Sequence, residues 1–212
     1  MPPREEILDA AAGLFVSQGL ATTTTRQIAE RVGIRQASLY YYFAGKDEIL
    51  LELLTQSVRP SLRVAATLES RSREDPAAAL YALALIDVRT LTQAPHNIAM
   101  LYLMPEVQGE EFTPFRAERD QLQAAYGRLG HAAAPSSGLD ETLIATLVMQ
   151  VVESVIQLRR SGGLRDSYAQ EIAASCLRLI GLGPPEVTRA RDAAAMLLTT
   201  AWPPCGEPLP DP

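Results

Sequence analysis

Apolar residues recur along most of this chain at the three- and four-residue spacing of α-helices, and no segment alternates with the two-residue period of a strand. The first helix is predicted over residues 4–18, where Ile7, Leu8 and Phe15 share one face. Gly19 follows at the position of a left-handed C-cap. The pattern predicts an all-α protein.

Two short helices are predicted next, joined by a tight turn. The threonine run at 22–25 supplies N-cap candidates for a helix over 26–32, and Gly33 ends that helix. The following helix is predicted over 35–43, with Gly45 after it. Two short helices around a glycine-containing turn are the helix-turn-helix plan, whose second helix enters the major groove of DNA.

A long helix is predicted to begin near Lys46 and to kink or break at Pro60. Further periodic segments, bounded by proline, glycine and serine, predict helices over 75–93, 96–104, 110–133, 140–161, 166–181 and 185–201. The last ten residues are rich in proline and are expected to be disordered. The expected division is a three-helix head at 1–46, a helical-bundle body for ligand binding and dimerisation at 47–202, and a tail at 203–212.

The composition is that of a soluble globular protein, with 47% hydrophobic and 21% charged residues among 212. No apolar run approaches the roughly 18 residues of a membrane span, and the N-terminus has no signal-peptide core. Two cysteines, Cys176 and Cys205, cannot form a disulfide framework. We therefore expect a cytoplasmic protein without a membrane partner.

The net charge of −6 argues against nucleic acid as a partner, but its distribution argues for it. Residues 22–46 carry Arg26, Arg31, Arg35 and Lys46 against Glu30 alone, a local charge of +3. Lys46 is also the single lysine of a chain that holds 18 arginines. A cationic segment in an acidic protein is typical of a nucleic-acid-binding surface.

The helix predicted over 35–43 presents side chains that suit DNA. Arginine bonds bidentately to guanine and glutamine to adenine, while serine and tyrosine hydroxyls donate to phosphate. The consecutive tyrosines at 40–42 fan out by about 100° per residue, so they cannot all face one core. At least one ring must face solvent, where an aromatic beside basic residues indicates a partner.

The run from Thr25 to Leu50 resembles the DNA-binding signature of the TetR (tetracycline-repressor-like) regulators. The residues that match it are Ile28-Ala29, Val32-Gly33-Ile34, Ser38-Leu39-Tyr40-Tyr41-Tyr42-Phe43 and Lys46-Asp47-Glu48-Ile49-Leu50. Tyr42 departs from the pattern, since many relatives have histidine there. Both side chains can reach a phosphate, so the departure affects sequence preference more than function.

The resemblance implies which residues contact DNA. The base-reading candidates are Arg35, Gln36, Ser38 and Tyr41. The phosphate-binding candidates are Thr25, Arg26, Tyr40, Tyr42 and Lys46. An ion pair with a nearby carboxylate is the alternative role for Lys46, and Arg31 is expected to be a solvated or ion-paired surface residue.

The resemblance also implies a homodimer, because two heads about 34–36 Å apart read a palindrome with more affinity than one. It places the interface on the last two long helices of the body, which are apolar on more than one side. The candidates are Leu143, Leu147, Val151, Val155, Leu158, Ile172, Cys176 and Leu179. A purely intramolecular core is the alternative for these helices.

A small-molecule pocket in the body is the third implication. Its candidate lining is adaptable or aromatic and suits an apolar effector of unknown identity. The candidates are Met100, Met104, Phe112, Phe115, Tyr126 and Met149. Each of them is also an ordinary core residue type. No cofactor or metal is expected, since His96 and His131 have no further ligands at metal spacing.

These observations favour a ligand-responsive transcriptional regulator, in this family most often a repressor, that binds a palindromic operator in double-stranded DNA. An enzyme is disfavoured, because the sequence has no catalytic residues in a recognisable motif: no nucleophile elbow, phosphate loop, dinucleotide fingerprint or zinc pair. The remaining alternative is a DNA-binding protein that is architectural, or controlled by a protein partner, without a small effector.

Overall fold

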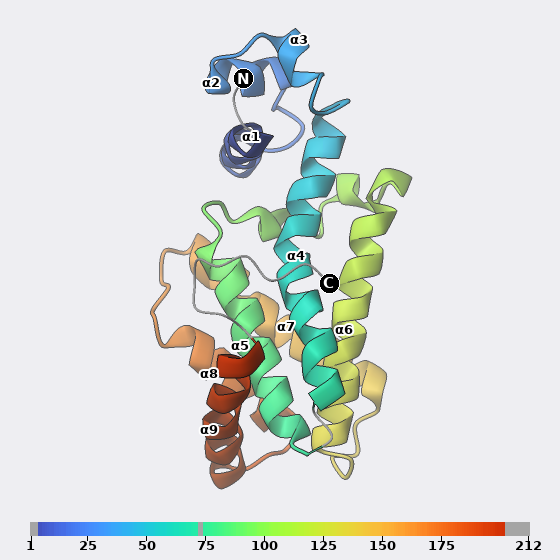
Figure 1. Cartoon of the computed structure of the whole chain (residues 1–212), viewed down its shortest axis with the longest axis vertical. Helices are drawn as coiled ribbons and strands as arrows, with labels where there is room; N and C mark the ends of the chain where they lie inside the picture. Colours follow the sequence, from blue (N-terminus) through green and yellow to red (C-terminus); the bar gives the residue numbers. More distant parts are fainter. Residues whose placement is uncertain (1–3, 72–73, 202–212) are drawn as a thin grey trace. The chain divides into compact units, whose positions relative to one another are not determined.

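The computed structural model describes residues 4–71 and 74–201, and these residues form helices and connecting loops without a strand (Figure 1). The predicted all-α class is confirmed. The α-helices are α1 Arg4–Gln18, α2 Thr25–Val32, α3 Gln36–Leu39, α4 Lys46–Arg71, α5 Pro76–Gln93, α6 Thr113–Ala133, α7 Glu141–Arg160, α8 Tyr168–Leu179 and α9 Pro184–Ala201. The 3₁₀ helices are η1 Ile98–Leu101, η2 Pro105–Gln108 and η3 Glu110–Phe112.

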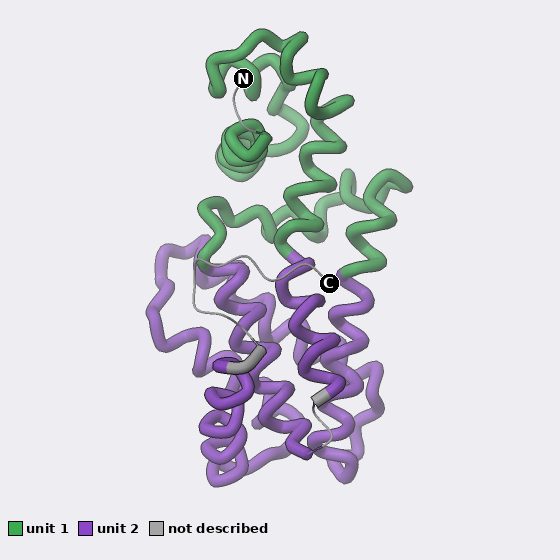
Figure 2. Tube along the Cα trace, viewed as in Figure 1, with its two compact units in different colours: residues 1–57, 93–118 green, residues 58–92, 119–212 purple. Residues whose placement is uncertain are grey.

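The chain forms two compact units (Figure 2). Unit 1 comprises residues 1–57 and 93–118, and unit 2 comprises residues 58–92 and 119–212. This division differs from the expected boundary at residue 46, because the segment with the 3₁₀ helices groups with the N-terminal helices. The tail predicted at 203–212 lies outside the described residues.

Local capping sets the ends of the first two helices, as predicted. Gly19 follows α1 with a φ of 93°. Thr24 is the N-cap of α2, where its hydroxyl accepts from the Gln27 amide and the Gln27 side chain accepts from the Thr24 amide. Gly33 ends α2 with a φ of 77°, a left-handed conformation that glycine adopts without steric cost. The head therefore follows signals that are local in the sequence.

Three expectations about helix ends were wrong. The helix predicted over 35–43 ends at Leu39, because the amides of Tyr41 and Tyr42 bond three residues back and tighten the chain into a turn. The segment 96–104 forms the 3₁₀ helix η1 rather than an α-helix. The break expected at Pro60 does not occur, because Pro60 lies inside the continuous helix α4; the alternative, a kink, stays a prediction.

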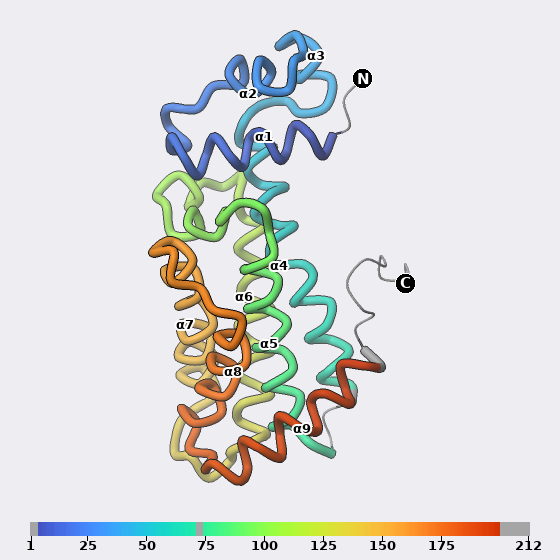
Figure 3. The backbone as a smooth tube through the Cα atoms, turned by 90° about the vertical axis from the view of Figure 1, so that its left-hand side faces the viewer, coloured from blue at the N-terminus to red at the C-terminus, as the bar shows by residue number. Residues whose placement is uncertain are grey.

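In unit 2 the second half of α4 runs beside α5 and α6 (Figures 1 and 3). Two glycines of α6 let α7 approach closely. A Cβ at Gly130 would lie 2.4 Å from Ile144 Cγ2, and one at Gly127 would lie 2.8 Å from the Glu141 carbonyl. The Arg119 guanidinium on α6 also makes a two-pronged ion pair with Glu153 on α7, at 2.7 and 2.8 Å.

A buried carboxyl joins three helices of this bundle. Asp87 on α5 accepts hydrogen bonds from the Ser61 hydroxyl on α4 and the Tyr126 hydroxyl on α6, both at 2.8 Å. Burial raises the pKa of Asp87 to about 6, and the two hydrogen bonds oppose that rise by stabilising the anion. The Asp87 carboxyl therefore holds its proton to a higher pH than an exposed aspartate does.

Candidate nucleic-acid interface

The turn between α2 and α3 is closed by backbone hydrogen bonds. The Gly33 amide donates to the Glu30 carbonyl at 3.2 Å, and the Ile34 amide donates to the Ala29 carbonyl at 2.9 Å. Behind this turn Ile28, Ala29, Leu39 and Phe43 are buried in unit 1. Because the apolar side chains of both helices face inward, their polar side chains face outward.

The outward face carries cationic and aromatic groups. Arg35, the N-cap residue of α3, is exposed, and its guanidinium has no hydrogen-bonding or ion-pair partner within residues 4–71 and 74–201. Tyr41 is 78% exposed, and its ring meets that of Tyr42 edge to face at 5.2 Å. An unpaired guanidinium close in sequence to an exposed aromatic ring is typical of a nucleic-acid-binding surface.

Three of the predicted contact residues hold one another in place. The Gln36 side-chain amide donates to the Thr25 hydroxyl at 2.9 Å, and the Thr25 and Tyr40 hydroxyls lie 3.2 Å apart. Gln36 Nε2 is also 3.4 Å from the Tyr40 hydroxyl. We call these three residues the Thr25 network. It fixes the start of α2 against α3, and it engages the Gln36 amide that a base contact would require.

The remaining predicted contacts differ in accessibility. Arg26 is exposed and pairs with Glu30 at 2.8 Å, and this pair raises the pKa of its guanidinium. The guanidinium remains a cation that can also meet a phosphate. Ser38 and Tyr42 are half-buried, so they present less of their side chains than Arg35 or Tyr41.

Lys46, predicted as a phosphate ligand with a carboxylate pair as the alternative, contacts backbone carbonyls in this structure, and its contact with phosphate stays a prediction. Its half-buried ammonium donates to the backbone carbonyls of Leu20 at 2.9 Å and Thr23 at 3.4 Å. It thereby ties the start of α4 to the loop between α1 and α2. An ammonium has three hydrogens, and two of them are directed at these carbonyls.

Arg4 is a residue that the sequence reasoning missed. Its guanidinium pairs with Glu52 on α4 and lies 4.5 Å from the centre of the Phe43 ring. The contact fixes α1 beside the end of the α3 turn. No local signal marks it, because the residues are far apart in the sequence.

The residues predicted for the dimer interface fall into two groups. Leu143 is 41% exposed, and Leu147, Val151, Leu158 and Leu179 are half-buried, so all five present apolar surface. Val155, Ile172 and Cys176 are buried within unit 2 and belong to its core. Burial also raises the pKa of the Cys176 thiol to about 12, which keeps it protonated.

One helix in the described residues, α7, is long and apolar enough to cross a membrane by length and composition alone. A core helix of a soluble protein can meet the same criterion. Only 39% of its most apolar stretch is buried, which leaves the Leu143 side of the helix uncovered.

The predicted effector-pocket residues lie in different units. Met100, Met104, Phe112 and Phe115 belong to unit 1, whereas Tyr126 and Met149 belong to unit 2. Phe112, Phe115, Tyr126 and Met149 are buried, and the two other methionines are half-buried. Each unit thus uses some of these residues in its own packing.

Comparison with known proteins finds a similarity that covers α1, α2, α3 and the start of α4. The family profile described as "Bacterial regulatory proteins, tetR family" matches residues 7–53. The HTH-type transcriptional repressor KstR2 of Mycobacterium tuberculosis is 49% identical over 51 residues, which are 24% of this chain and 26% of the repressor. The match to this curated relative therefore spans about a quarter of its length.

Two further similarities extend over most of the chain. The crystal structure of AmtR from Mycobacterium smegmatis is 37% identical and has a TM-score of 0.86, covering 94% of this chain and 95% of AmtR. The HTH-type transcriptional regulator AcrR of Shigella flexneri is 26% identical over 202 residues, covering 92% of this chain and 87% of AcrR. Both similarities include the residues that form the outward face of α2 and α3.

Proposed function

The chain belongs to the TetR family of bacterial regulatory proteins, and from this premise we propose that it is a transcriptional repressor that binds a palindromic operator as a homodimer. The observation that carries the proposal is the outward face of α2 and α3, where the free guanidinium of Arg35 and the exposed ring of Tyr41 accompany a local positive charge. Such a protein acts beside the DNA, in the cytoplasm. Its family is one of regulators rather than enzymes.

In this proposal Arg35 and Tyr41 enter the major groove. Arginine reads guanine through its O6 and N7 atoms, and the tyrosine ring adds apolar contact and a hydroxyl. Arg26, Thr25, Tyr40 and Tyr42 lie around them and contact phosphates, which set the register on the duplex but do not read sequence. Gln36 contributes through its free carbonyl oxygen, because its amide holds the Thr25 network.

The exposed side of α7 supports the dimer. Leu143, Leu147, Val151 and Leu158 recur at helical spacing on a helix whose opposite side is buried in unit 2. An apolar stripe in water is stabilised when a second copy covers it. A twofold pair of heads then matches the twofold symmetry of a palindrome.

An effector would control such a dimer through differential binding. A small apolar molecule that binds the DNA-free dimer more tightly than the DNA-bound dimer lowers operator affinity. The factor equals the ratio of its affinities for these two states. The methionines and aromatic residues of the body are suitable lining for it. The alternative, control by a protein partner or an architectural role, requires no such molecule.

Selection of bound fragments from random DNA tests the proposal. A repressor of this kind should enrich one palindrome and bind it at least about a thousandfold more tightly than unrelated DNA at the same salt concentration. The Arg35→Ala and Tyr41→Ala variants should lose that preference while keeping their helical content. Arg31→Gln is the matched control, since Arg31 is also an exposed cation of unit 1. Uniform affinity for all sequences would instead favour the architectural role.

A further inference from the structure

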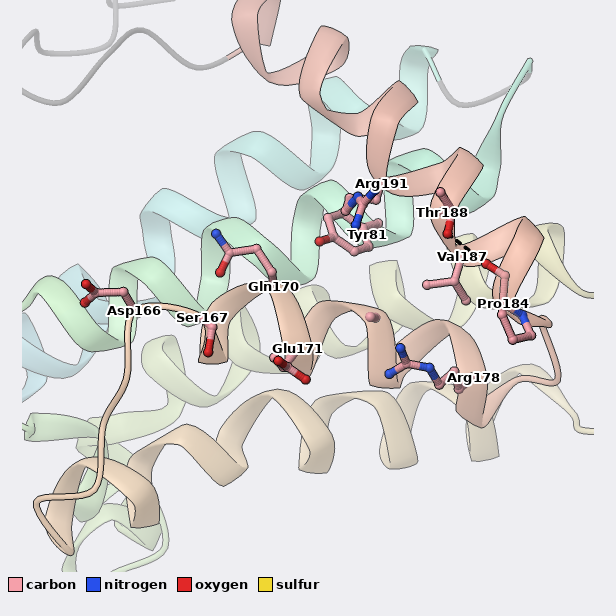
Figure 4. A pocket seen from close by; sticks show the side chains of 11 residues that line it. Tyr81, Asp166, Ser167, Gln170, Glu171, Arg178, Pro184, Val187, Thr188 and Arg191 are labelled. Carbon is pink, nitrogen blue, oxygen red and sulfur yellow. Dashed lines mark hydrogen bonds between the residues drawn. The ribbon is translucent and has the colours of Figure 1, made fainter.

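A surface pocket in unit 2 has no role in the function proposed above. It has a volume of about 570 Å³ and lies where α5, α8 and α9 meet (Figure 4). Its lining includes Tyr81, Asp166, Glu171, Arg178, Thr188 and Arg191. All of these residues belong to unit 2, and none of them belongs to the outward face of α2 and α3.

The Tyr81 hydroxyl is an unsatisfied polar group at this pocket. Tyr81 is 1% exposed, and its hydroxyl has no hydrogen-bonding partner among the described residues. An unpaired buried hydroxyl is unfavourable, and a ligand acceptor that bonds to it removes that cost. The oxygen is closed to solvent in the empty pocket, so an acceptor reaches it by displacing an exposed side chain such as Gln170, which lies nearby in Figure 4.

The surroundings of this hydroxyl favour an anion. Burial raises the pKa of Tyr81, so the phenol stays a donor, while the positive charges of Arg191, Arg89 and Arg178 oppose the rise. Arg178 is exposed and has no ion-pair partner in the described part of the chain. Arg191 pairs with its neighbour Asp192 at 3.1 Å, an exposed contact that contributes little stability.

The opposite end of the pocket is acidic. Asp166 precedes α8 and Glu171 lies in its first turn, whereas Arg178 lies in its last turn. Figure 4 shows this order along the chain, with Asp166 at the left of the view, Glu171 near the middle and Arg178 to its right. Neither acidic side chain has an ion-pair partner among the described residues. The pocket therefore pairs a negative end with a positive end.

We propose that this pocket binds a small zwitterion, whose carboxylate meets Arg178, Arg191 and the Tyr81 hydroxyl and whose ammonium meets Glu171 and Asp166. Charge-assisted hydrogen bonds hold both ends, and a ligand with a single charge binds more weakly because it leaves one end without a partner.

The site is distinct from the proposed dimer interface on the same helix. At about 100° per residue, Glu171, Ala174 and Arg178 share one side of α8. Leu179 faces a different side, and the buried residues Ala173 and Leu177 lie between α8 and the core of the unit.

Calorimetric titration of the full chain without DNA tests this proposal with three matched probes. 6-Aminohexanoate carries both charges, hexanoate carries the carboxylate alone, and hexylamine carries the ammonium alone. We expect saturable binding of 6-aminohexanoate at least tenfold tighter than that of either singly charged probe. Equal binding of 6-aminohexanoate and hexanoate, or no saturable binding of any probe at millimolar concentrations, would overturn the proposal.

Two variants assign the binding to this pocket. Tyr81→Phe removes only the hydroxyl and should weaken 6-aminohexanoate binding about tenfold, as expected for a hydrogen bond to a charged group. Arg178→Gln should weaken 6-aminohexanoate binding by a similar factor. This variant tests the positive end of the pocket at an exposed residue. Arg189→Gln, an exposed arginine of α9 outside the lining, is the control. Unchanged affinity in both pocket variants would place the binding elsewhere and refute the assignment.

Discussion

The ammonium of Lys46 at the start of α4 donates a hydrogen bond to the backbone carbonyl of Leu20, 2.9 Å away in the loop that follows α1. A second bond to Thr23 completes the link. The lysine therefore connects the helix that leaves the head to the loop that precedes α2, and this role competes with direct phosphate binding.

Lys46→Met should lower the free energy of unfolding by about 1–3 kcal/mol, because it leaves carbonyls without their charged donor. Operator affinity should fall with the salt dependence of binding unchanged, since no phosphate contact is lost. Urea unfolding and binding at several salt concentrations measure the two effects. If stability were unchanged and the slope of log affinity against log salt concentration became shallower by about one, Lys46 would instead be a phosphate ligand. Arg31→Gln controls for loss of charge.

The Thr25 network should contribute to DNA affinity through geometry. Thr25→Val keeps the shape of the side chain but removes the hydroxyl that Gln36 and Tyr40 share. We expect operator affinity to fall by about two- to tenfold, the equivalent of one hydrogen bond, with little change in stability because the site is exposed. Thr22→Val is the matched control, since its hydroxyl bonds within the preceding loop to the Gln18 carbonyl. Equal affinity of the two variants would contradict a positioning role.

The buried Asp87 should make stability depend on pH. The pKa of its carboxyl is about 6 in the folded protein against an ordinary value of 3.8, so the folded state binds more protons between these values. The free energy of unfolding should therefore fall as the pH rises from about 4 to 6, and the loss persists above that range.

Asp87→Asn should remove this dependence. Its free energy of unfolding should exceed that of the wild type by a few kcal/mol as the pH rises from 4 to 7, at about 1.4 kcal/mol per pKa unit. Urea unfolding across this range measures the difference. Asp120→Asn, at an exposed aspartate of α6, serves as the reference. If the difference in free energy of unfolding between Asp87→Asn and the wild type stayed constant with pH, the raised pKa of Asp87 would not be its cause.

The apolar side of α7 should hold the dimer. Replacing both Leu147 and Val151 by Glu puts charges into the proposed interface and should give monomers in sedimentation velocity, with operator affinity reduced more than tenfold. Gln150→Glu adds a charge to an exposed position of the same helix and should leave the dimer intact. Dimers that persist in the double variant would move the interface away from α7. Val155→Glu is unsuitable for this test, because Val155 is 1% exposed and the change would disrupt the core.

Helical periodicity and local caps such as Thr24 and Gly33 were sufficient to predict the all-α class, most helix ranges and the inward and outward sides of the head. The family signature at 25–50 was equally local and was confirmed by the match at 7–53. Local patterns are sufficient wherever a residue's role depends on neighbours within about one or two helical turns.

The tertiary structure alone decided the features that depend on distant residues. It directed Lys46 to Leu20, joined Asp87 to Ser61 and Tyr126, and grouped residues 93–118 with the N-terminal helices. It also buried Val155 while leaving Leu143 exposed on the same helix. Apolar residues on two sides of one helix look alike in a sequence, and only the packing of the other helices determines which side is covered.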